Sequence, residues 1–172
     1  ECDWSSDVCS SDLYTTSGLY TVTAVDGFGC STNMAGSVNI TIDPLPVVYT
    51  VTGGGGYCSG GPGVHIGLSF SSTGISYNLI YFATNVATVP GSGSGLDFGV
   101  WTTSGLYTVT AVNNTTGCTS NMSGTATVSL NPPPFTYNVT GGGNYCIGTS
   151  GVNVGLDMSD AGVNYQLYRG GT

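Results

Sequence analysis

Residues 102–112 read TTSGLYTVTAV, and the same eleven residues recur at 15–25, 87 positions earlier. A second pair, YTVTGGGGYC at 49–58 and YNVTGGGNYC at 137–146, is separated by 88 positions. Self-similarity at a fixed spacing is the sequence signature of a tandem-repeat protein. The sequence therefore predicts a repeat of about 88 residues.

Two proline-rich stretches, DPLP at 43–46 and NPPP at 131–134, stand at equivalent places in the repeat. Proline fixes φ and lacks the backbone N–H, which suits a stiff connector between domains. These joints divide the chain into the last part of one repeat (14–46), a complete repeat (47–134) and the first part of a third (135–172). We expect both ends of the chain to be truncation points.

Apolar residues in the complete repeat alternate with polar or small ones, and this period of two is typical of half-buried strands. The alternation is seen at 64–70, 75–80, 96–98, 107–111 and 126–130, and 49–52 adds a further strand. The glycine clusters at 53–56 and 141–143 are expected to form flexible loops. About seven short strands in such a length indicate an all-β fold, an immunoglobulin-like sandwich.

A tyrosine near the start of the penultimate strand supports the same fold. In SGLYTV at 104–109, Tyr107 lies two residues before Val109, which stands where an antibody domain carries its second core cysteine. This is the arrangement of a tyrosine corner. Tyr107, and Tyr20 at the equivalent place in the first repeat, are therefore interpreted as structural residues.

Several motifs together, among them YxVTGGGxYCxG, GVxxGL, TTSGLYTVTA and TGCTxNMxG, resemble the tandem immunoglobulin-like repeats of very large secreted surface proteins of Bacteroidota. Adhesins are among those proteins. The resemblance covers residues 14–172. It implies a place outside the cell at the bacterial surface and a non-enzymatic role as a spacer or stalk. The implied partners are neighbouring repeats and a surface glycan or protein at the end of the array.

Residues 3–13, DWSSDVCSSDL, resemble the translation of a sequencing adaptor. We therefore interpret residues 1–13 as an assembly artefact, expect them to be disordered, and leave them out of the fold. Neither Cys2 nor Cys9 is assigned a role.

The composition excludes two classes of partner. Charged residues make up only 6% of the chain, with no lysine and the single arginine Arg169. Binding to nucleic acid or to an anionic membrane surface depends on clustered Lys and Arg, so neither is expected. The sequence also lacks an apolar run of the roughly 20 residues that span a bilayer, so membrane insertion is not expected.

Two cysteines recur in each repeat, one in the glycine-rich segment and one near the last hairpin. In a secreted domain this regularity predicts a disulfide, and we favour Cys58 with Cys118, which leaves Cys30 and Cys146 without partners. The rival pairing is Cys30 with Cys58. In a standard sandwich the two regions lie at opposite ends, and Cα atoms more than about 7 Å apart cannot be bridged.

The residue types that carry catalysis or hold metals are sparse. His65 is the only histidine of the chain and alternates onto the outward face of its strand, and Asp97 is the only acid of the complete repeat. Zinc needs clustered Cys and His ligands, calcium needs several oxygen ligands, and glycoside hydrolysis needs paired carboxylates. We predict no enzymatic activity, no cofactor and no metal.

Carbohydrate binding is the alternative function, because exposed aromatic rings stack on sugars. Trp101 is the candidate glycan contact, with Tyr81 and Phe82 as further aromatic residues, and Tyr14 takes the place of Trp101 in the first repeat.

A second alternative is an extracellular filament built by head-to-tail self-association. The two partial repeats are complementary parts of one fold, and each is expected to expose an apolar face. Residues of 14–46 in one chain would then pack against those of 135–172 in another: Tyr20, Val22 and Ala24 against Val152, Val154, Leu156, Tyr165 and Leu167. Cys30 and Cys146 are the pair that this association is expected to bring within bonding reach.

Overall fold

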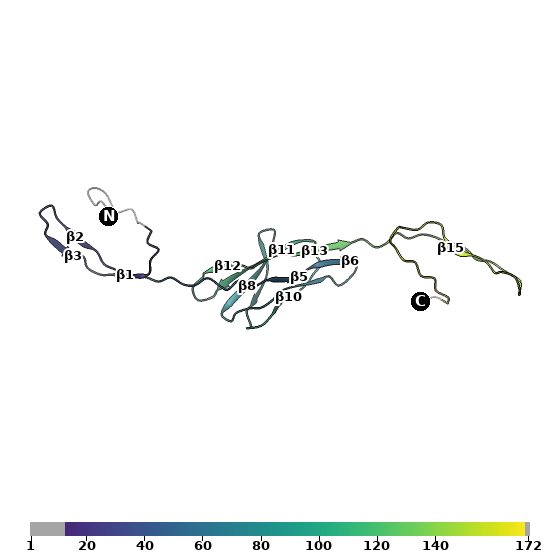
Figure 1. Cartoon of the computed structure of the whole chain (residues 1–172), viewed down its shortest axis with the longest axis horizontal. Helices are drawn as coiled ribbons and strands as arrows, with labels where there is room; N and C mark the ends of the chain where they lie inside the picture. Colours follow the sequence, from purple (N-terminus) through teal and green to yellow (C-terminus); the bar gives the residue numbers. More distant parts are fainter. Residues whose placement is uncertain (1–12, 171–172) are drawn as a thin grey trace.

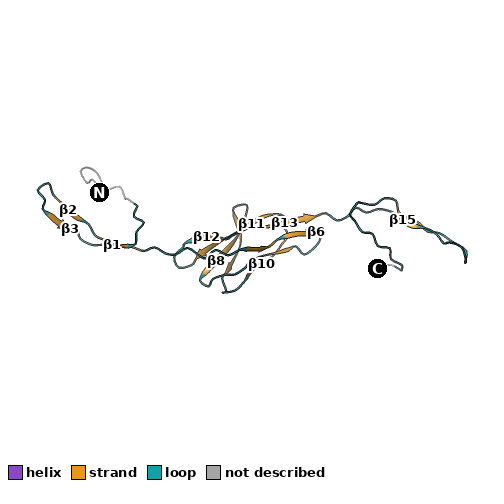
Figure 2. Cartoon of the chain, viewed as in Figure 1, coloured by secondary structure: helices purple, strands orange, loops and turns teal. Residues whose placement is uncertain are grey.

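The computed structural model describes residues 13–170, and these form strands, turns and loops without a helix (Figure 2). The predicted all-β fold is therefore confirmed. The expectations for residues 1–13 lie, apart from Leu13, outside the described residues.

Residues 47–134 form a sandwich of two sheets. The smaller sheet has the order β10-β7-β5, and its strands are β5 (Val51–Gly53), β7 (Val64–Leu68) and β10 (Leu96–Trp101). The larger sheet has the order β6-β13-β11-β8-β9, with β12 also paired to β11. Its strands are β6 (Gly55–Cys58), β8 (Ile75–Tyr81), β9 (Thr84–Pro90), β11 (Gly105–Asn113), β12 (Thr119–Asn121) and β13 (Ala126–Asn131).

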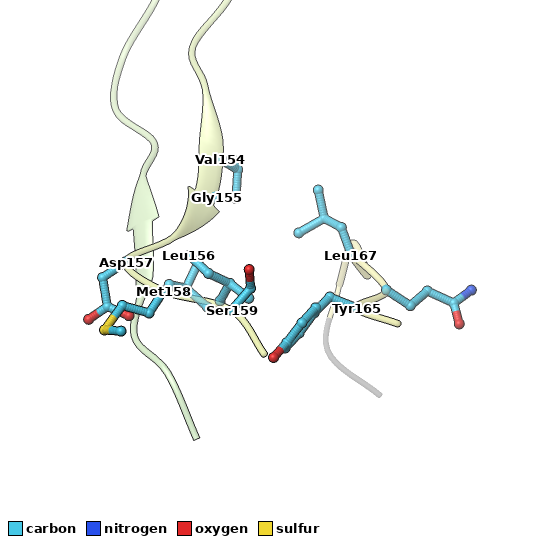
Figure 3. Close-up of a pocket in the computed structure, with 10 residues that line it drawn as sticks. Val154, Gly155, Leu156, Asp157, Met158, Ser159, Tyr165 and Leu167 are labelled. Carbon is cyan, nitrogen blue, oxygen red and sulfur yellow. The ribbon is translucent and has the colours of Figure 1, made fainter. Parts of the chain in front are cut away.

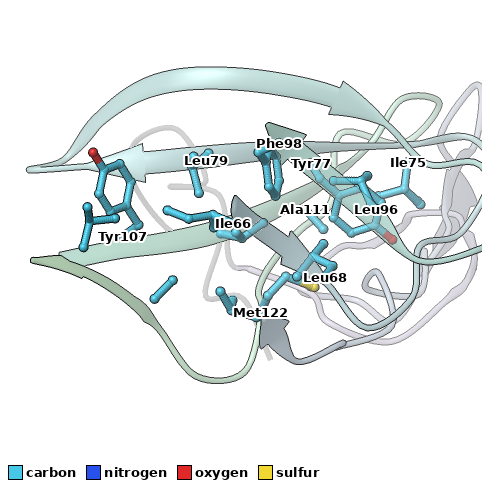
Figure 4. Close-up of a cluster of buried hydrophobic side chains, with 14 residues drawn as sticks. Ile66, Leu68, Ile75, Tyr77, Leu79, Leu96, Phe98, Tyr107, Ala111 and Met122 are labelled. Atoms are coloured by element: carbon cyan, nitrogen blue, oxygen red, sulfur yellow. The ribbon is translucent and has the colours of Figure 1, made fainter. Parts of the chain in front are cut away.

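The core lies between the two sheets and consists of the inward residues of the alternating strands (Figure 4). Along β8 and β11 every second side chain is buried, as the period of two predicts. Ser71 is the one buried polar residue of the described chain, and its hydroxyl donates to the Ser94 carbonyl at 2.7 Å. The buried apolar residues are Val51, Ile66, Leu68, Ile75, Tyr77, Leu79, Leu96, Phe98, Tyr107, Val109, Ala111, Met122, Ala126 and Val128.

Three strands of the sandwich were not predicted: β6, β9 and β12. β9 is the edge strand of the larger sheet, so most of its side chains are exposed and no clear alternation marks it. It ends at Pro90, which an edge position tolerates because no further strand needs its missing N–H. β12 is only three residues long, too short to show an alternation in the sequence.

The glycine cluster at 53–56 is not a flexible loop; it carries the chain from one sheet to the other. Gly53 ends β5 in the smaller sheet, and Gly55 begins β6, which pairs in parallel with β13 in the larger sheet. Gly53 and Gly54 have φ of 86° and 78°. A Cβ on Gly53 would lie 2.1 Å from the His65 carbonyl oxygen, and one on Gly54 would lie 2.7 Å from that of Thr127. Only glycine fits this crossing.

The segments on either side of the sandwich repeat parts of it, strand for strand. Gly18 pairs with Ile40 as Gly105 pairs with Val128, and Gly141 pairs with Val154 as Gly53 pairs with Ile66. The flanking strands are β1 (Gly18–Tyr20), β2 (Thr23–Val25), β3 (Ser31–Asn33), β4 (Val38–Ile40), β14 (Val139–Gly141) and β15 (Val154–Leu156).

The described chain is elongated, with the sandwich in the middle (Figure 1). The segment with β1 to β3 extends from one end of the sandwich, and the segment with β15 extends from the other. The joints 43–46 and 131–134 lie between these segments and the sandwich. The chain therefore enters and leaves the sandwich at opposite ends.

Gly54→Ala tests the glycine crossing. The added Cβ meets a backbone carbonyl in an unfavourable region of φ, so the free energy of unfolding is expected to fall by about 2–4 kcal/mol. Gly55→Ala, with φ of 119° and open space around the Cβ, is expected to lose about 1–2 kcal/mol. Gly95→Ala, with ordinary contacts at 3.6 Å, is the near-neutral control. Urea unfolding followed by circular dichroism measures all three, and an equal loss at Gly54 and Gly55 would contradict the close approach.

Candidate functional site

The one histidine and the one acidic residue of the sandwich form an exposed pair. His65 on β7 and Asp97 on β10 are joined by a contact of 2.8 Å between Nδ1 and Oδ2. The Gly99 N–H donates to the Asp97 carboxylate and, together with His65, holds the pKa of Asp97 below its usual value. Both side chains are more than half exposed, so this surface contact has a small energetic effect.

Residues 13–170 contain no group of three or more His, Cys, Asp and Glu side chains close enough to share a metal ion. Over the same range there is no helix with the length and apolar character needed to cross a bilayer. The absence of a metal, a cofactor and an activity stays a prediction from the sequence.

Four aromatic rings form a row that runs from the core to the surface at one end of the sandwich. Trp101 lies 5.5 Å from Tyr107, Tyr107 stacks on Tyr81 at 4.9 Å, and Tyr81 meets Phe82 edge-on at 4.6 Å, measured between ring centroids. Tyr107 is 1% exposed, whereas Phe82 is 81% exposed. The row therefore connects the packed core to an aromatic ring that stands in solvent.

Tyr107 is the structural member of this row. Its hydroxyl donates to the Thr103 carbonyl at 2.9 Å, and the hydroxyl of Tyr20 donates to the Thr16 carbonyl at 2.8 Å. A bond back to the backbone a few residues upstream is the geometry of a tyrosine corner. Burial, the largest cause, raises the pKa of Tyr107, which keeps its phenol protonated and able to donate.

Trp101 does not stand free at the surface. It ends β10, is half-buried, and packs against the core and Tyr107. Its indole Nε1 is buried and has no hydrogen-bond partner within the described chain. Trp101 is therefore a poorer platform for a sugar ring than its sequence position suggested, because its ring already contacts protein.

Phe82 occupies the tip of the β8–β9 hairpin in a strained conformation. Tyr81 pairs with Thr84, which leaves Phe82 and Ala83 as a two-residue turn, and their φ values are 43° and 61°. Such a turn favours Asn and Gly, because a side chain at positive φ is strained. The hairpin thus holds an apolar ring in water at an energetic cost that Asn-Gly would avoid, and strain of this kind gathers at functional sites.

A hollow of about 590 Å³ lies in the segment after the second joint. Figure 3 shows Tyr165 and Leu167 facing Val154 and Leu156 across an open space. The equivalent residues of the sandwich, Tyr77, Leu79, Ile66 and Leu68, are buried in the core. The hollow is therefore the unfilled half of a core, and it is not interpreted as a ligand site.

The predicted disulfide between Cys58 and Cys118 is not formed. All four cysteines within residues 13–170 (Cys30, Cys58, Cys118 and Cys146) are free thiols. Cys58 ends β6 beside Asn131 at the second joint, whereas the Cys118 thiol lies 3.9 Å from the Asp43 carbonyl at the first joint. The sandwich holds Cys58 and Cys118 at opposite ends, which corrects the prediction.

No known protein-family model matches the chain, and no curated protein sequence is significantly similar to it.

Proposed function

We propose that the chain is part of a stalk of tandem immunoglobulin-like repeats that belongs to a large bacterial cell-surface adhesin. The stalk stands outside the cell, has no enzymatic activity and holds a binding end away from the surface. The observation that carries the proposal is the path of the chain, which enters and leaves the sandwich at opposite ends (Figure 1). Repeats joined in this way add their lengths.

The joints support an extended array. Each consists of a short proline-rich stretch, and Pro46, the last residue of the first joint, is buried. A joint with fixed φ angles and a buried proline keeps successive domains apart and restricts their bending.

The order of the strands supports the immunoglobulin-like assignment. The chain begins in the smaller sheet, switches to the larger sheet, and there pairs in parallel with the last strand, β13. The tyrosine-corner hydrogen bond of Tyr107 comes at the start of the strand that precedes the last hairpin. Both features suit a sandwich of that class.

A specific observation also favours binding through an aromatic ring, as in a carbohydrate-binding module. Phe82 is held in solvent by a strained turn, with Tyr81 packed against its edge. An exposed ring on a rigid hairpin can stack on the apolar face of a sugar without ordering a flexible loop. This second candidate places the contact at Phe82 in place of Trp101.

The exposed faces of the two partial repeats favour the third candidate, a filament formed by self-association. Val22 and Met34 in the first segment are exposed, whereas the equivalent Val109 and Met122 are buried in the sandwich. In the sandwich, Val109 and Met122 share one core with Ile66, Leu68, Tyr77 and Leu79. The equivalents of those four residues line the hollow in the last segment. A second copy of this chain therefore offers a matching surface, and large exposed apolar faces favour association.

Small-angle X-ray scattering tests the stalk. A chain with residues 47–134 inserted a second time after Pro134 is expected to have a maximum dimension larger by at least about 30 Å, the length of a nine-residue strand. Its cross-sectional radius is expected to stay unchanged. A rise in cross-section without the gain in length would mean that repeats pack side by side, and would contradict the proposal.

A glycan array tests the aromatic contact. Phe82→Asn with Ala83→Gly removes the ring and gives the turn its preferred residues, so the variant is expected to be more stable by about 1 kcal/mol. If Phe82 binds sugar, the same variant loses binding at least about tenfold, because aromatic stacking contributes 1 kcal/mol or more. Val86→Ala on the neighbouring edge strand is the control. Unchanged binding by the double variant would reject Phe82 as the contact.

Analytical ultracentrifugation tests self-association. The full chain is expected to form concentration-dependent oligomers, and Val22→Asp is expected to reduce them because it places a charge in the new core. Thr21→Asp is the matched control, because the equivalent Thr108 is exposed in the sandwich. A strictly monomeric full chain at every concentration would reject the filament.

A further inference from the structure

Cys58 lies directly beside the second joint. It is the last residue of β6 and is the register partner of Asn131, the residue that opens the joint NPPP. The next residue, Ser59, donates its backbone N–H to the Asn131 carbonyl at 3.0 Å. The backbone at Cys58 is therefore fixed against the residue through which the chain leaves the sandwich.

Cys118 lies beside the first joint, at the other end of the sandwich. It follows the turn between β11 and β12, and its Sγ is 3.9 Å from the carbonyl oxygen of Asp43. Asp43 opens the joint DPLP. Cys118 is partly exposed, and its backbone is fixed by a hydrogen bond of 2.9 Å from the Asn113 N–H to its carbonyl.

Asp43 and Asn131 are equivalent residues of the repeat, 88 positions apart. In a tandem array each joint residue would therefore lie next to two cysteines. The counterpart of Cys58 comes from the repeat before the joint, and the counterpart of Cys118 comes from the repeat after it. The Asn131 carbonyl accepts from the Ser59 N–H, and the equivalent carbonyl of Asp43 contacts the Cys118 thiol. The backbone at Cys58 and the thiol of Cys118 therefore lie beside equivalent joint residues.

We propose that the cysteines form disulfides across the joints: Cys58 of one repeat bonds to the counterpart of Cys118 in the following repeat. Cys58 is exposed and Cys118 is partly exposed, so an oxidant can reach both. The pair needs two successive repeats that carry both cysteines. Residues 14–46 have strands equivalent only to β11–β13, so no cysteine of the Cys58 type precedes Asp43 among the described residues, and the four thiols are free.

The bond forms by ordinary thiol–disulfide exchange with a small-molecule disulfide such as oxidised glutathione. The thiolate of one cysteine attacks a glutathione sulfur, which forms a mixed disulfide and releases one glutathione thiolate. The thiolate of the second cysteine then attacks the protein sulfur of the mixed disulfide and releases the second glutathione. Two protein thiols are oxidised, one glutathione disulfide is reduced, and two protons are taken up by the released thiolates.

The test uses the full chain with residues 47–134 inserted a second time after Pro134. Every cysteine is changed to Ser except Cys58 of the first copy and Cys118 of the second. In oxidised glutathione this variant is expected to close an internal disulfide: it loses both free thiols, stays a monomer on a non-reducing gel and carries no glutathione by intact mass. The internal disulfide is expected to close about 100-fold faster in the native variant than in the same variant in urea, because only the fold raises the effective concentration of the two thiols.

Two control variants carry the same number of thiols in other places. One keeps Cys58 and Cys118 of the first copy, and the other keeps Cys118 of the first copy and Cys58 of the second. Both are expected to form no internal disulfide under native conditions, and their thiols instead carry glutathione as mixed disulfides, which intact mass measurement detects. Closure of the same-copy pair as fast as the cross-joint pair would overturn the proposal, and so would a cross-joint pair that forms no internal disulfide in a chain with a native circular dichroism spectrum.

A second measurement keeps the proposal testable if the serine variants do not fold. The doubled chain with all its cysteines is oxidised; Thr119→Ser in the second copy marks its Cys118 peptide by mass, and Ser59→Thr in the first copy marks its Cys58 peptide. Peptide mapping after chymotryptic digestion is expected to join the marked peptide to Cys58 of the first copy. Linkage to Cys58 of the second copy would overturn the proposal. The proposal depends on the tandem arrangement of repeats and not on adhesion, so the scattering experiment can fail while this one succeeds.

Discussion

The crossing at Gly53–Gly55 is the constraint on which the rest of the sandwich depends. It moves the chain from the smaller sheet to the larger one within three residues, and at Gly53 and Gly54 the backbone passes so close to His65 and Thr127 that a Cβ is excluded. The crossing lets β6 pair with β13, so the first part of the repeat is hydrogen-bonded to the last. It also carries Cys58 to the end of the sandwich where the chain leaves.

The core of the sandwich takes side chains from both the first and the last strands of residues 47–134, and this explains the flanking segments. Their strand pairs keep the register of the sandwich, so local sequence is enough to set the hairpins. Their apolar residues stay exposed, because the core of the fold needs side chains from both sheets. The register is therefore a local property of the sequence, whereas burial is a property of the whole sandwich.

The sequence predicted the all-β fold and the main strands, because their apolar residues alternate. It did not predict β6 or β9: β6 is built partly of glycine, and β9 is an exposed edge, so neither shows the alternation of a half-buried strand. The candidate site was predicted less well. Trp101 and Phe82 were both named as aromatic residues, but only the turn geometry and burial distinguish the packed ring from the exposed one. The predicted disulfide between Cys58 and Cys118 was wrong, because the pairing depends on the end of the sandwich at which each cysteine lies.

The same topology determines how the sandwich carries a pulling force, which bears on the proposed stalk. Because β6 and β13 run in parallel while the chain enters and leaves at opposite ends, a force along the chain pulls these strands past each other. Their hydrogen bonds are then loaded together in shear, whereas the bonds of a hairpin pulled from its open end break one after another. A bond from Cys58 to the next repeat would transfer part of that force from β6 directly across the joint. The proline-rich stretch would then set the spacing of the repeats without carrying the whole load.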